Sequence, residues 1–596
     1  MIQERLEKLR ALMKDHHMDA YLVETSDFHG SEYVGDYFKC RAFISGFTGS
    51  AGTVVVTADK AGLWTDGRYF LQAAQQLEGT GITLYRMGQP GVPSIEEFLI
   101  DNLASGGCLG FDGRTVNAAF ASRLQRDFAP RNISICYEHD LIGEIWEDRP
   151  AMSQEPVMLL DTCYSGCPRE EKFRKIRQEL ASRGADILVL TSLDDIAWLL
   201  NIRGGDVAYN PVLLSYLVLS SDKLLLFSSE KAIPAPVKAQ LEASGVTFYG
   251  YDDIYAYIRS IPPSKTVWLD ETKANYSILR SLQPGVEILS ETNPTLLPKA
   301  VKNEVEVHNE RIAHIKDGVA MVKFIYWLKH NVGKIPMTEM SVGDYLANLR
   351  REQEHSMGLS FESIIGYAQH GAIVHYSATP ETDAALKPEN FLLVDSGGQY
   401  LEGTTDITRT ISLGAVSEQQ KLHYTAVLRG HLNLTAAKFL YGCRGVNLDY
   451  LARSPLWELG LDYDHGTGHG VGYFLNVHEA PNGFRWKIVP ERNDSAVFEE
   501  GMITSNEPGF YLAGEYGIRL ENMIVCRKAQ KTPYGQFMCF ENLTFVPFDR
   551  QAIAPELMSE RERTLLNEYH AQVYEKISPY LTQEESDWLR EETKPL

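Results

Sequence analysis

The sequence predicts a multi-domain α/β protein with two similar leading domains and a third domain of different design. The first indication is length, because 596 residues exceed what one hydrophobic core organises, and about 150 residues per domain gives three or four domains. The second is an internal repeat at a constant offset of 167 residues, which aligns Leu6 with Phe173 and Asp27 with Asp194. The third is a new helix start near residue 303.

In both copies of the repeat, an amphipathic helix is predicted to lead into a buried strand. Apolar residues recur at helical spacing in each copy, and a short apolar run follows at residues 20–23 and at residues 187–190. Polar residues follow each run. We therefore place two α/β domains at residues 1–156 and 157–299.

The third domain is predicted to occupy residues 300–596 and to begin with a helix. Asn303 is expected to cap this helix, and Glu306 lies in its first turn. The leading domains show no catalytic cluster, whereas five polar residues in distinctive contexts all follow residue 300. These are Asp395 in V-D-S-G, Asp406 in T-T-D-I-T, His469 in G-T-G-H-G, Glu507 in N-E-P-G and Glu521 in R-L-E-N.

Composition excludes several classes of partner. The formal net charge of −22 disfavours nucleic acids and anionic membranes, because both repel an acidic surface. No apolar run approaches the ~18 residues of a membrane-spanning helix, and residues 1–14 are charged and amphipathic, unlike a signal peptide. The eight cysteines lack metal-type spacing. We expect a cytoplasmic protein in a reducing compartment.

The five polar residues form a set that favours metal binding. Four carboxylates and one imidazole are the oxygen-rich ligands that hold two hard divalent cations. Without cations, carboxylates at short range repel one another and take up protons. Two divalent ions offset the four negative charges, so the sequence predicts a dinuclear metal site.

A β-hairpin is predicted to bring Asp395 and Asp406 together. Residues 391–394 and 404–411 are strand-like, and residues 396–403 have turn chemistry. On one continuous strand, two residues eleven apart would face opposite sides. A hairpin folding around Tyr400 and Leu401 instead makes them cross-strand partners, with Cβ atoms roughly 4.5–5.5 Å apart.

His465 and His469 lie four residues apart, which superficially suggests one face of a helix. The glycines at positions 466, 468, 470 and 472 oppose a stable helix. We therefore predict an irregular loop in which only His469 is a metal ligand. The loop lacks the sequence of a phosphate-binding motif.

Taken together, these motifs resemble those of the pita-bread metallopeptidases of family M24, in particular the long, three-domain cytosolic form of aminopeptidase P, the Xaa-Pro aminopeptidases. The resemblance covers essentially the whole chain. Its strings are FISGFTGSAGT from Phe43, KNEVEVHNERIAHIKDG from Lys302, FLLVDSGGQYLEGTTDITRTI from Phe391, LDYDHGTGHGVGYFLNVHEAP from Leu461, MITSNEPGFY from Met502 and GIRLEN from Gly517.

This resemblance implies the fold and the metals. Two α/β domains like the creatinase/prolidase N-terminal domain would precede an α+β pita-bread catalytic domain with a C-terminal helical extension, in a homodimer. Asp395 would bind one metal, Asp406 and Glu521 would bridge both, and His469 with Glu507 would complete the second. The ions would be Mn²⁺, with Zn²⁺ or Co²⁺ as alternatives, and a hydroxide between them would cleave the bond before a penultimate proline.

The resemblance also implies further catalytic residues. His478 would contact the scissile carbonyl and its oxyanion. Glu507 would pass a proton to the leaving proline nitrogen, with His375 assisting the geometry.

Four residues are expected around the substrate pocket. His465, Tyr511 and Arg519 would shape the pocket for the proline side of the peptide. Arg203, which follows a strand predicted at residues 198–200, would lie near the entrance, with a surface salt bridge as the alternative.

Three other functions are compatible with parts of this pattern. A prolidase shares the metal ligands but cleaves only dipeptides. A methionine aminopeptidase shares the core fold but lacks two leading domains of this size. A pita-bread relative that has lost its metals and acts as a binding module is disfavoured, because all five ligands are present.

Overall fold

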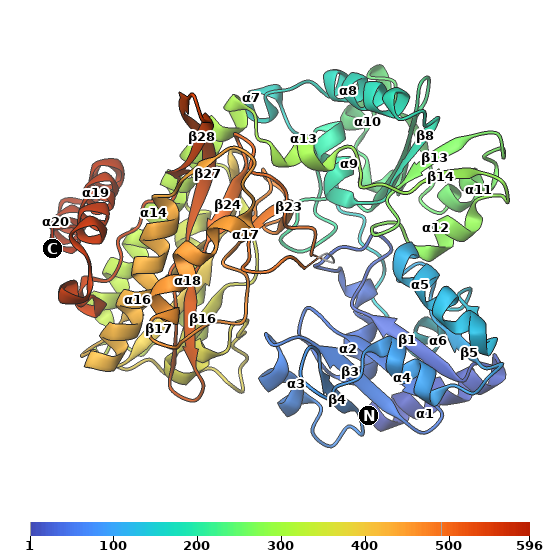
Figure 1. The fold of residues 1–596 in the computed structure, drawn as a ribbon, viewed down its shortest axis with the longest axis horizontal. Coiled ribbons are helices and arrows are strands. Elements are labelled where there is room, and N and C mark those ends of the chain that lie inside the picture. Colours follow the sequence, from blue (N-terminus) through green and yellow to red (C-terminus); the bar gives the residue numbers. More distant parts are fainter. Residues whose placement is uncertain (1, 490–491) are drawn as a thin grey trace. The chain divides into compact units, whose positions relative to one another are not determined.

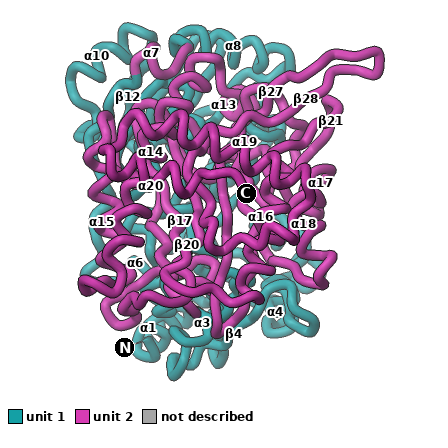
Figure 2. Tube along the Cα trace, turned by 90° about the vertical axis from the view of Figure 1, so that its left-hand side faces the viewer, with its two compact units in different colours: residues 1–160, 167–295 teal, residues 161–166, 296–596 magenta. Residues whose placement is uncertain are grey.

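The computed structural model describes residues 2–489 and 492–596 and divides into two compact units (Figures 1 and 2). Unit 1 comprises residues 1–160 and 167–295, and unit 2 comprises residues 161–166 and 296–596. Both predicted leading domains fall mainly in unit 1, where each has its own sheet. The domain boundaries after residues 156 and 299 stay a prediction.

The two six-stranded sheets of unit 1 have the same topology. The strand orders are β4-β3-β2-β1-β5-β6 and β12-β11-β10-β8-β13-β14. In each sheet the first strand of the repeat is central, with an antiparallel neighbour on one side and a parallel neighbour on the other. The repeated α/β design predicted from the offset of 167 residues is therefore confirmed in the strand order.

The strands of these two sheets are short. They are β1 (Ala20–Glu24), β2 (Thr53–Thr57), β3 (Ala61–Thr65), β4 (Thr83–Arg86), β5 (Cys108–Gly110), β6 (Ser134–Cys136), β8 (Ile187–Leu190), β10 (Ser215–Ser220), β11 (Leu224–Ser228), β12 (Thr247–Tyr249), β13 (Thr266–Leu269) and β14 (Glu287–Leu289). The helices include α1 (Ile2–Asp15), α4 (Ile95–Asn102), α5 (Ala118–Phe128), α6 (Leu141–Ile145), α8 (Arg169–Ser182), α10 (Ala235–Ala243), α11 (Asp253–Arg259) and α12 (Tyr276–Ser281). Helices α1 and α8 are the predicted repeat helices.

The strand predicted at residues 198–200 is wrong, because these residues end helix α9 (Leu193–Leu200). Asp194 and Asp195 in the first turn favour a helix through its dipole. Since the helix is apolar and buried along its length, the run at its end resembles a buried strand in sequence. Arg203 lies just after it, in the two-residue strand β9 (Ile202–Arg203).

Unit 2 begins its long helix α14 (Glu304–Asn331) where the sequence predicts it. Asn303 accepts hydrogen bonds from the N–H groups of Val305 and Glu306, and Glu306 accepts one in return from the N–H of Asn303, which completes a capping box. The Asn303 amide also donates to the carbonyl of Ser165 at 2.9 Å. One residue therefore caps α14 and ties residues 161–166 to it.

The strands of unit 2 form four sheets. Their orders are β16-β17-β20, β15-β18-β19, β21-β28-β27-β24-β22-β23 and β25-β26. The bounds are β15 (Ser356–Leu359), β16 (Ile364–Tyr367), β17 (Phe391–Ser396), β18 (Gly398–Tyr400), β19 (Gly403–Thr404), β20 (Ile407–Ser412), β21 (Lys438–Leu440), β22 (Gly468–Gly470), β23 (Glu479–Phe484), β24 (Ile503–Asn506), β25 (Gly509–Leu512), β26 (Tyr516–Arg519), β27 (Asn522–Thr532) and β28 (Gly535–Asn542).

Helices of unit 2 pack against one face of β17 and form a hydrophobic core there. Val322 and Ile325 of α14 share this core with Leu392 and Val394 of β17. Because side chains alternate along a strand, Asp395 points away from the face of Val394. The other long helices are α15 (Glu339–Arg351), α16 (Glu418–Thr435), α18 (Tyr450–Trp457), α19 (Glu560–Ile577) and α20 (Gln583–Glu592).

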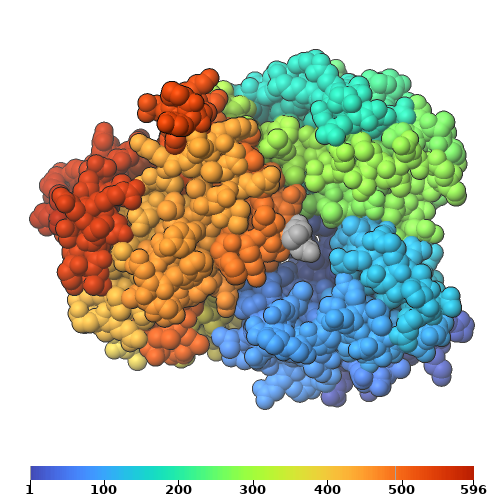
Figure 3. Space-filling model, in the orientation of Figure 1, coloured from blue at the N-terminus to red at the C-terminus, as the bar shows by residue number. Residues whose placement is uncertain are grey.

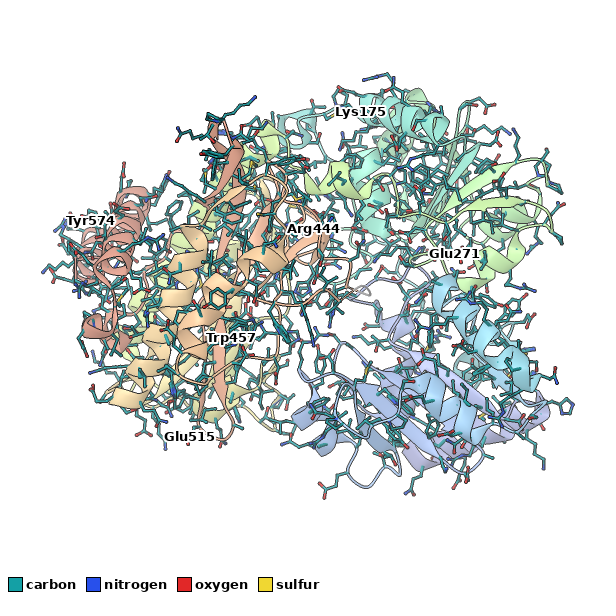
Figure 4. All side chains as sticks on the ribbon, viewed as in Figure 1. Lys175, Glu271, Arg444, Trp457, Glu515 and Tyr574 are labelled. Carbon is teal, nitrogen blue, oxygen red and sulfur yellow. The ribbon has the colours of Figure 1, made fainter. Side chains whose placement is uncertain are left out.

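Helices α19 and α20 form the C-terminal extension of unit 2 and lie on its surface (Figure 3). Helix α19 packs against α14 and α16. Arg590 of α20 donates hydrogen bonds to the hydroxyl of Tyr574 on α19, at 2.7 and 3.1 Å. Figure 4 labels Tyr574 on this extension. Among the described residues, no helix is long and apolar enough to cross a membrane.

Replacing Asn303 tests the start of α14. Asn303→Ala removes the cap and should destabilise unit 2 by about 1 kcal/mol, measured as a shift of its unfolding transition. Asn303→Asp keeps the accepting oxygen and should restore most of the loss. An Ala variant as stable as the unsubstituted protein would contradict the assignment of the cap.

Candidate metal centre

The predicted hairpin is present, but its predicted register is wrong. Asp395 in β17 faces Thr408 in β20, so Asp406 is its diagonal neighbour rather than its direct partner. The turn centres on residues 401 and 402, one position later than predicted. Gly403 permits this, since its φ of +150° is one that residues with side chains rarely adopt. Asp406 lies in the connection between β19 and β20.

The structure brings all five predicted metal ligands together. Asp406, His469 and Glu521 each offer a ligand atom, and these atoms lie within 4.8 Å of one another. Nε2 of His469 lies 3.4 Å from Oδ2 of Asp406 and 3.4 Å from Oε1 of Glu507. Asp395 and Glu507 act electrostatically on both Asp406 and Glu521. The five residues therefore lie together in unit 2.

Burial makes this cluster of like charges unfavourable without cations. Burial, with the nearby charges of Asp395 and Glu507, raises the pKa of Asp406 well above its usual range. Burial also raises the pKa of Glu521, and the nearby charges of Asp406, Glu507 and Asp395 raise it further. These carboxyl groups bind protons strongly unless another positive charge replaces them.

The donor set fits hard divalent cations. Among the described residues, Oδ1 of Asp395 and Oδ1 of Asp406 are buried without a hydrogen-bond partner. Buried carboxylate oxygens without donors are unfavourable, and oxygen donors in this number suit cations such as Mn²⁺. The residues present are thus the kind that would hold such ions.

Hydroxyl groups orient two of the carboxylates. Thr408 donates to Oε2 of Glu521 at 2.7 Å, and Ser505 donates to Oε1 of Glu507 at 3.0 Å. Ser505 also accepts from the N–H of His469 at 2.9 Å. Neither Thr408 nor Ser505 is among the residues predicted from the sequence. Thr408 lies two residues after Asp406, and Ser505 lies two residues before Glu507. Because alternate residues of a strand share one face, this spacing is the signal that could have identified both.

His469 lies on the short strand β22 and not in the irregular loop that we predicted, although the expectation that it is not helical is confirmed. Close backbone approach explains the strand. A Cβ added at Gly468 would lie 1.9 Å from the carbonyl oxygen of Ser505, and one at Gly470 would lie 2.2 Å from that of Glu479. Glycines here let β24 and β23 pack directly against β22.

Two of the predicted catalytic histidines lie beside this cluster. The rings of His478 and His469 are perpendicular, with centroids 4.3 Å apart. Val374, the residue before His375, contacts Arg519: its carbonyl oxygen accepts a hydrogen bond from Nη2 of Arg519 at 3.4 Å. Both histidines are half-buried.

Three predicted pocket residues form one chain of hydrogen bonds. Arg519 donates to Oδ2 of Asp395 at 2.6 Å and to the hydroxyl of Tyr511 at 2.7 Å. The Tyr511 hydroxyl lies 2.8 Å from Nε2 of His465. Burial, reinforced by the Arg519 charge, lowers the pKa of His465 to about 3, and burial raises the pKa of Tyr511 to about 12. Both are neutral at pH 7.

Arg203 lies in unit 1, where its guanidinium donates to the carbonyl oxygens of Ile202 at 2.8 Å and Ala197 at 3.4 Å. It is 3% exposed, so the alternative of an exposed surface salt bridge does not describe it. Its predicted position near the substrate stays a prediction.

Another group of three possible ligands occurs in unit 1. Atoms of His16, His139 and Glu144 lie within 4.8 Å of one another, but the histidines are half-buried and the glutamate is exposed. Because these side chains remain in contact with water, the group does not bury like charges against one another, as the cluster in unit 2 does.

Comparison with known proteins places this geometry in a family. Residues 309–528 match metallopeptidase family M24, and residues 536–596 match the C-terminal region of that family. Residues 5–138 and 148–306 each match a creatinase/prolidase N-terminal domain. The chain belongs to metallopeptidase family M24. The predicted family is thereby confirmed.

Relatives match over the full length. An Xaa-Pro aminopeptidase 1 of Dictyostelium discoideum is 38% identical, over 100% of this chain and 97% of its own. Aminopeptidase P2 of Arabidopsis thaliana is also 38% identical, over 100% of this chain and 89% of its own. The crystal structure of an X-prolyl aminopeptidase from Caenorhabditis elegans, a cytosolic enzyme with a di-nuclear active site, covers 100% of both chains at 34% identity, with a TM-score of 0.95. The predicted fold class is confirmed.

Replacing Asp406 tests the electrostatic account. A carboxyl group with a raised pKa destabilises the metal-free fold increasingly as pH rises above its unfolded value of about 4. Asp406→Asn should therefore leave the chelated protein at pH 7 as stable as the unsubstituted protein or more so. At 100 times Kd, Mn²⁺ should stabilise the unsubstituted protein by about 2.7 kcal/mol and the variant far less.

The measurement is thermal unfolding with and without metal, with the exposed Asp587→Asn as matched control. Equal stabilisation of the unsubstituted protein and the Asp406 variant by Mn²⁺ would contradict the assignment of Asp406 as a metal ligand.

Proposed function

We propose that this chain is a dinuclear-metal Xaa-Pro aminopeptidase, which hydrolyses the bond between the N-terminal residue of a peptide and a penultimate proline. The observation that supports this most is the cluster of four carboxylates and His469, next to the hydrogen-bonded chain of Arg519, Tyr511 and His465. Membership of family M24 and the full-length relatives named Xaa-Pro aminopeptidase support the same activity.

Two divalent cations would be held by the five clustered residues. We propose that Asp395 binds one ion, that Asp406 and Glu521 are shared by both, and that His469 and Glu507 complete the second. When bound, the cations supply Lewis-acid activation of water and of the substrate carbonyl. Carboxylate-rich ligation suits Mn²⁺, and Zn²⁺ or Co²⁺ would also bind.

The protein's own groups would handle protons and developing charge. His478, whose ring packs edge-to-face with that of His469, would donate to the substrate carbonyl oxygen and bind it more strongly as negative charge develops. Glu507, which is less buried than Glu521, would accept a proton and pass it to the leaving proline nitrogen. His375 would orient the substrate from the neighbouring segment.

The chain of Arg519, Tyr511 and His465 would form the wall of the pocket for the proline side. Because Arg519 binds both Asp395 and Tyr511, it would set the distance between the metal cluster and this wall. His465 is neutral at every working pH, so the wall presents no imidazolium to the proline ring.

A dedicated enzyme for this bond is chemically reasonable. The amide of an Xaa-Pro bond has no N–H, and proline restricts the conformation of the residue before it. Peptidases that hold the scissile N–H or need free rotation there fail on such bonds. We propose that the enzyme acts in the cytoplasm, since the C. elegans relative is described as cytosolic. We also propose that it forms a homodimer, as the family resemblance implies.

Metal removal and substrate length test the proposal together. Chelation should abolish hydrolysis of an Arg-Pro-Pro tripeptide, and Mn²⁺ should restore it. Tripeptides and longer Xaa-Pro peptides should be cleaved at least as well as the Xaa-Pro dipeptide. Cleavage restricted to the dipeptide would instead make the protein a prolidase, and full activity with metal content near zero would exclude the dinuclear mechanism.

His478→Ala separates catalysis from metal binding. The variant should keep its full metal content while kcat falls on the order of 10²–10³-fold, with a smaller change in KM. The exposed His330→Ala on α14 is the matched control. Metal loss in the His478 variant would make His478 a ligand or a support, and an unchanged kcat would remove it from the mechanism.

A further inference from the structure

A buried ion pair lies next to the metal centre and is not part of it. The ammonium group of Lys302 contacts Oε1 of Glu479, and each side chain is 1% exposed. A buried lysine and a buried glutamate are both costly unless they are paired. Neither belongs to the proposed set of metal ligands, so the pair needs another explanation.

The carboxylate side of the pair is joined to two histidines of the site. Glu479 follows His478 in sequence and begins strand β23, where it faces Gly470 of β22. A Cβ added at Gly470 would lie 2.2 Å from the carbonyl oxygen of Glu479, so the two backbones are in direct contact. Gly470 in turn follows His469. Fixing Glu479 therefore fixes the segment that positions the His478 ring against the His469 ring.

The lysine side of the pair is joined to a third strand of the site. The N–H of Lys302 donates to the carbonyl of Gly501 at 3.1 Å. Gly501 has a φ of +96°, and a Cβ there would lie 2.3 Å from the carbonyl oxygen of Lys302. The chain continues from Gly501 into β24 and Glu507. Lys302 thus connects the strand that leads to Glu507 with the strand that follows His478.

Lys302 is held between neighbouring elements of unit 2. It lies between α13 (Leu296–Ala300) and the cap of α14 at Asn303, and α13 packs against β23 (Figure 1). Its charge also acts on Glu310, a buried residue of α14 whose Oε1 accepts from the N–H of Thr404 at 3.2 Å. The ammonium therefore has a fixed position relative to the elements around the metal centre.

On this basis, which rests on the proposed function, we propose that Lys302 is a positioning residue for catalysis. Its ion pair with Glu479 holds His478 at the angle and distance that the substrate carbonyl requires. The pair stabilises the transition state through His478, while the ligands hold the metals without it. No substrate contact by Lys302 is involved.

The test removes both charges and keeps the volume. Lys302→Met/Glu479→Gln removes both charges of the pair at once, so neither partner is left as a lone buried charge and the fold should persist. We expect full metal content, a nearly unchanged KM and a kcat lower by about tenfold to a hundredfold, because a small misplacement of a catalytic group costs on that order. The matched control is Lys329→Met/Asp549→Asn, which removes a Lys–Asp pair with a 2.8 Å contact elsewhere in unit 2 and should leave kcat within about twofold.

A double-mutant cycle shows whether Lys302 acts through His478. In the His478→Ala background, removing the Lys302–Glu479 pair should change kcat by less than about twofold, because the group that it positions is gone. Equal fold losses in both backgrounds would overturn the proposal, as would an unchanged kcat in the charge-free variant or loss of metal from it. If the unsubstituted protein does not cleave Xaa-Pro peptides, the proposed function fails, and this outcome is distinct from all of these.

Discussion

Repulsion among four clustered carboxylates, three of them buried, is the constraint on which unit 2 depends. Asp406 and Glu521 lie almost completely buried beside Asp395 and Glu507, and burial with mutual repulsion raises the pKa of both well above the usual range. Such a cluster persists only if protons or cations neutralise it. Arg519 neutralises part of the charge at Asp395, and divalent ions would neutralise the remainder.

The fold of unit 2 meets this constraint with rigid strands. The five clustered residues lie on or next to β17, β20, β22, β24 and β27, which pair in antiparallel sheets. Glycines at 468 and 470 allow the strands around His469 to approach closely. Hydroxyl groups of Thr408 and Ser505 hold two carboxylates in orientation. The protein itself therefore orients several of the clustered side chains, and such preorganisation is the condition for electrostatic stabilisation of a transition state.

The sequence predicted the repeated domains, the five clustered residues and the start of α14, because each depends on local pattern or on a distinctive motif. The predicted centre of the hairpin turn was one residue too early, because the sequence does not reveal that Gly403 adopts a positive φ. Residues 198–200 were predicted as a strand but end a helix, because a short apolar run is equally consistent with a buried strand and a buried helix. The Lys302–Glu479 pair joins residues 177 positions apart, a contact that no local pattern reveals.

Proton release on metal binding tests the central claim most directly. Calorimetric titration of the chelated protein with Mn²⁺ near pH 7, in two buffers of different ionisation enthalpy, gives both the number of ions bound and the number of protons released. The charge cluster predicts two ions per chain and a net release of protons, since the ligands must lose the protons that their raised pKa values retain. Binding of fewer than two ions, or binding of two without proton release, would contradict it.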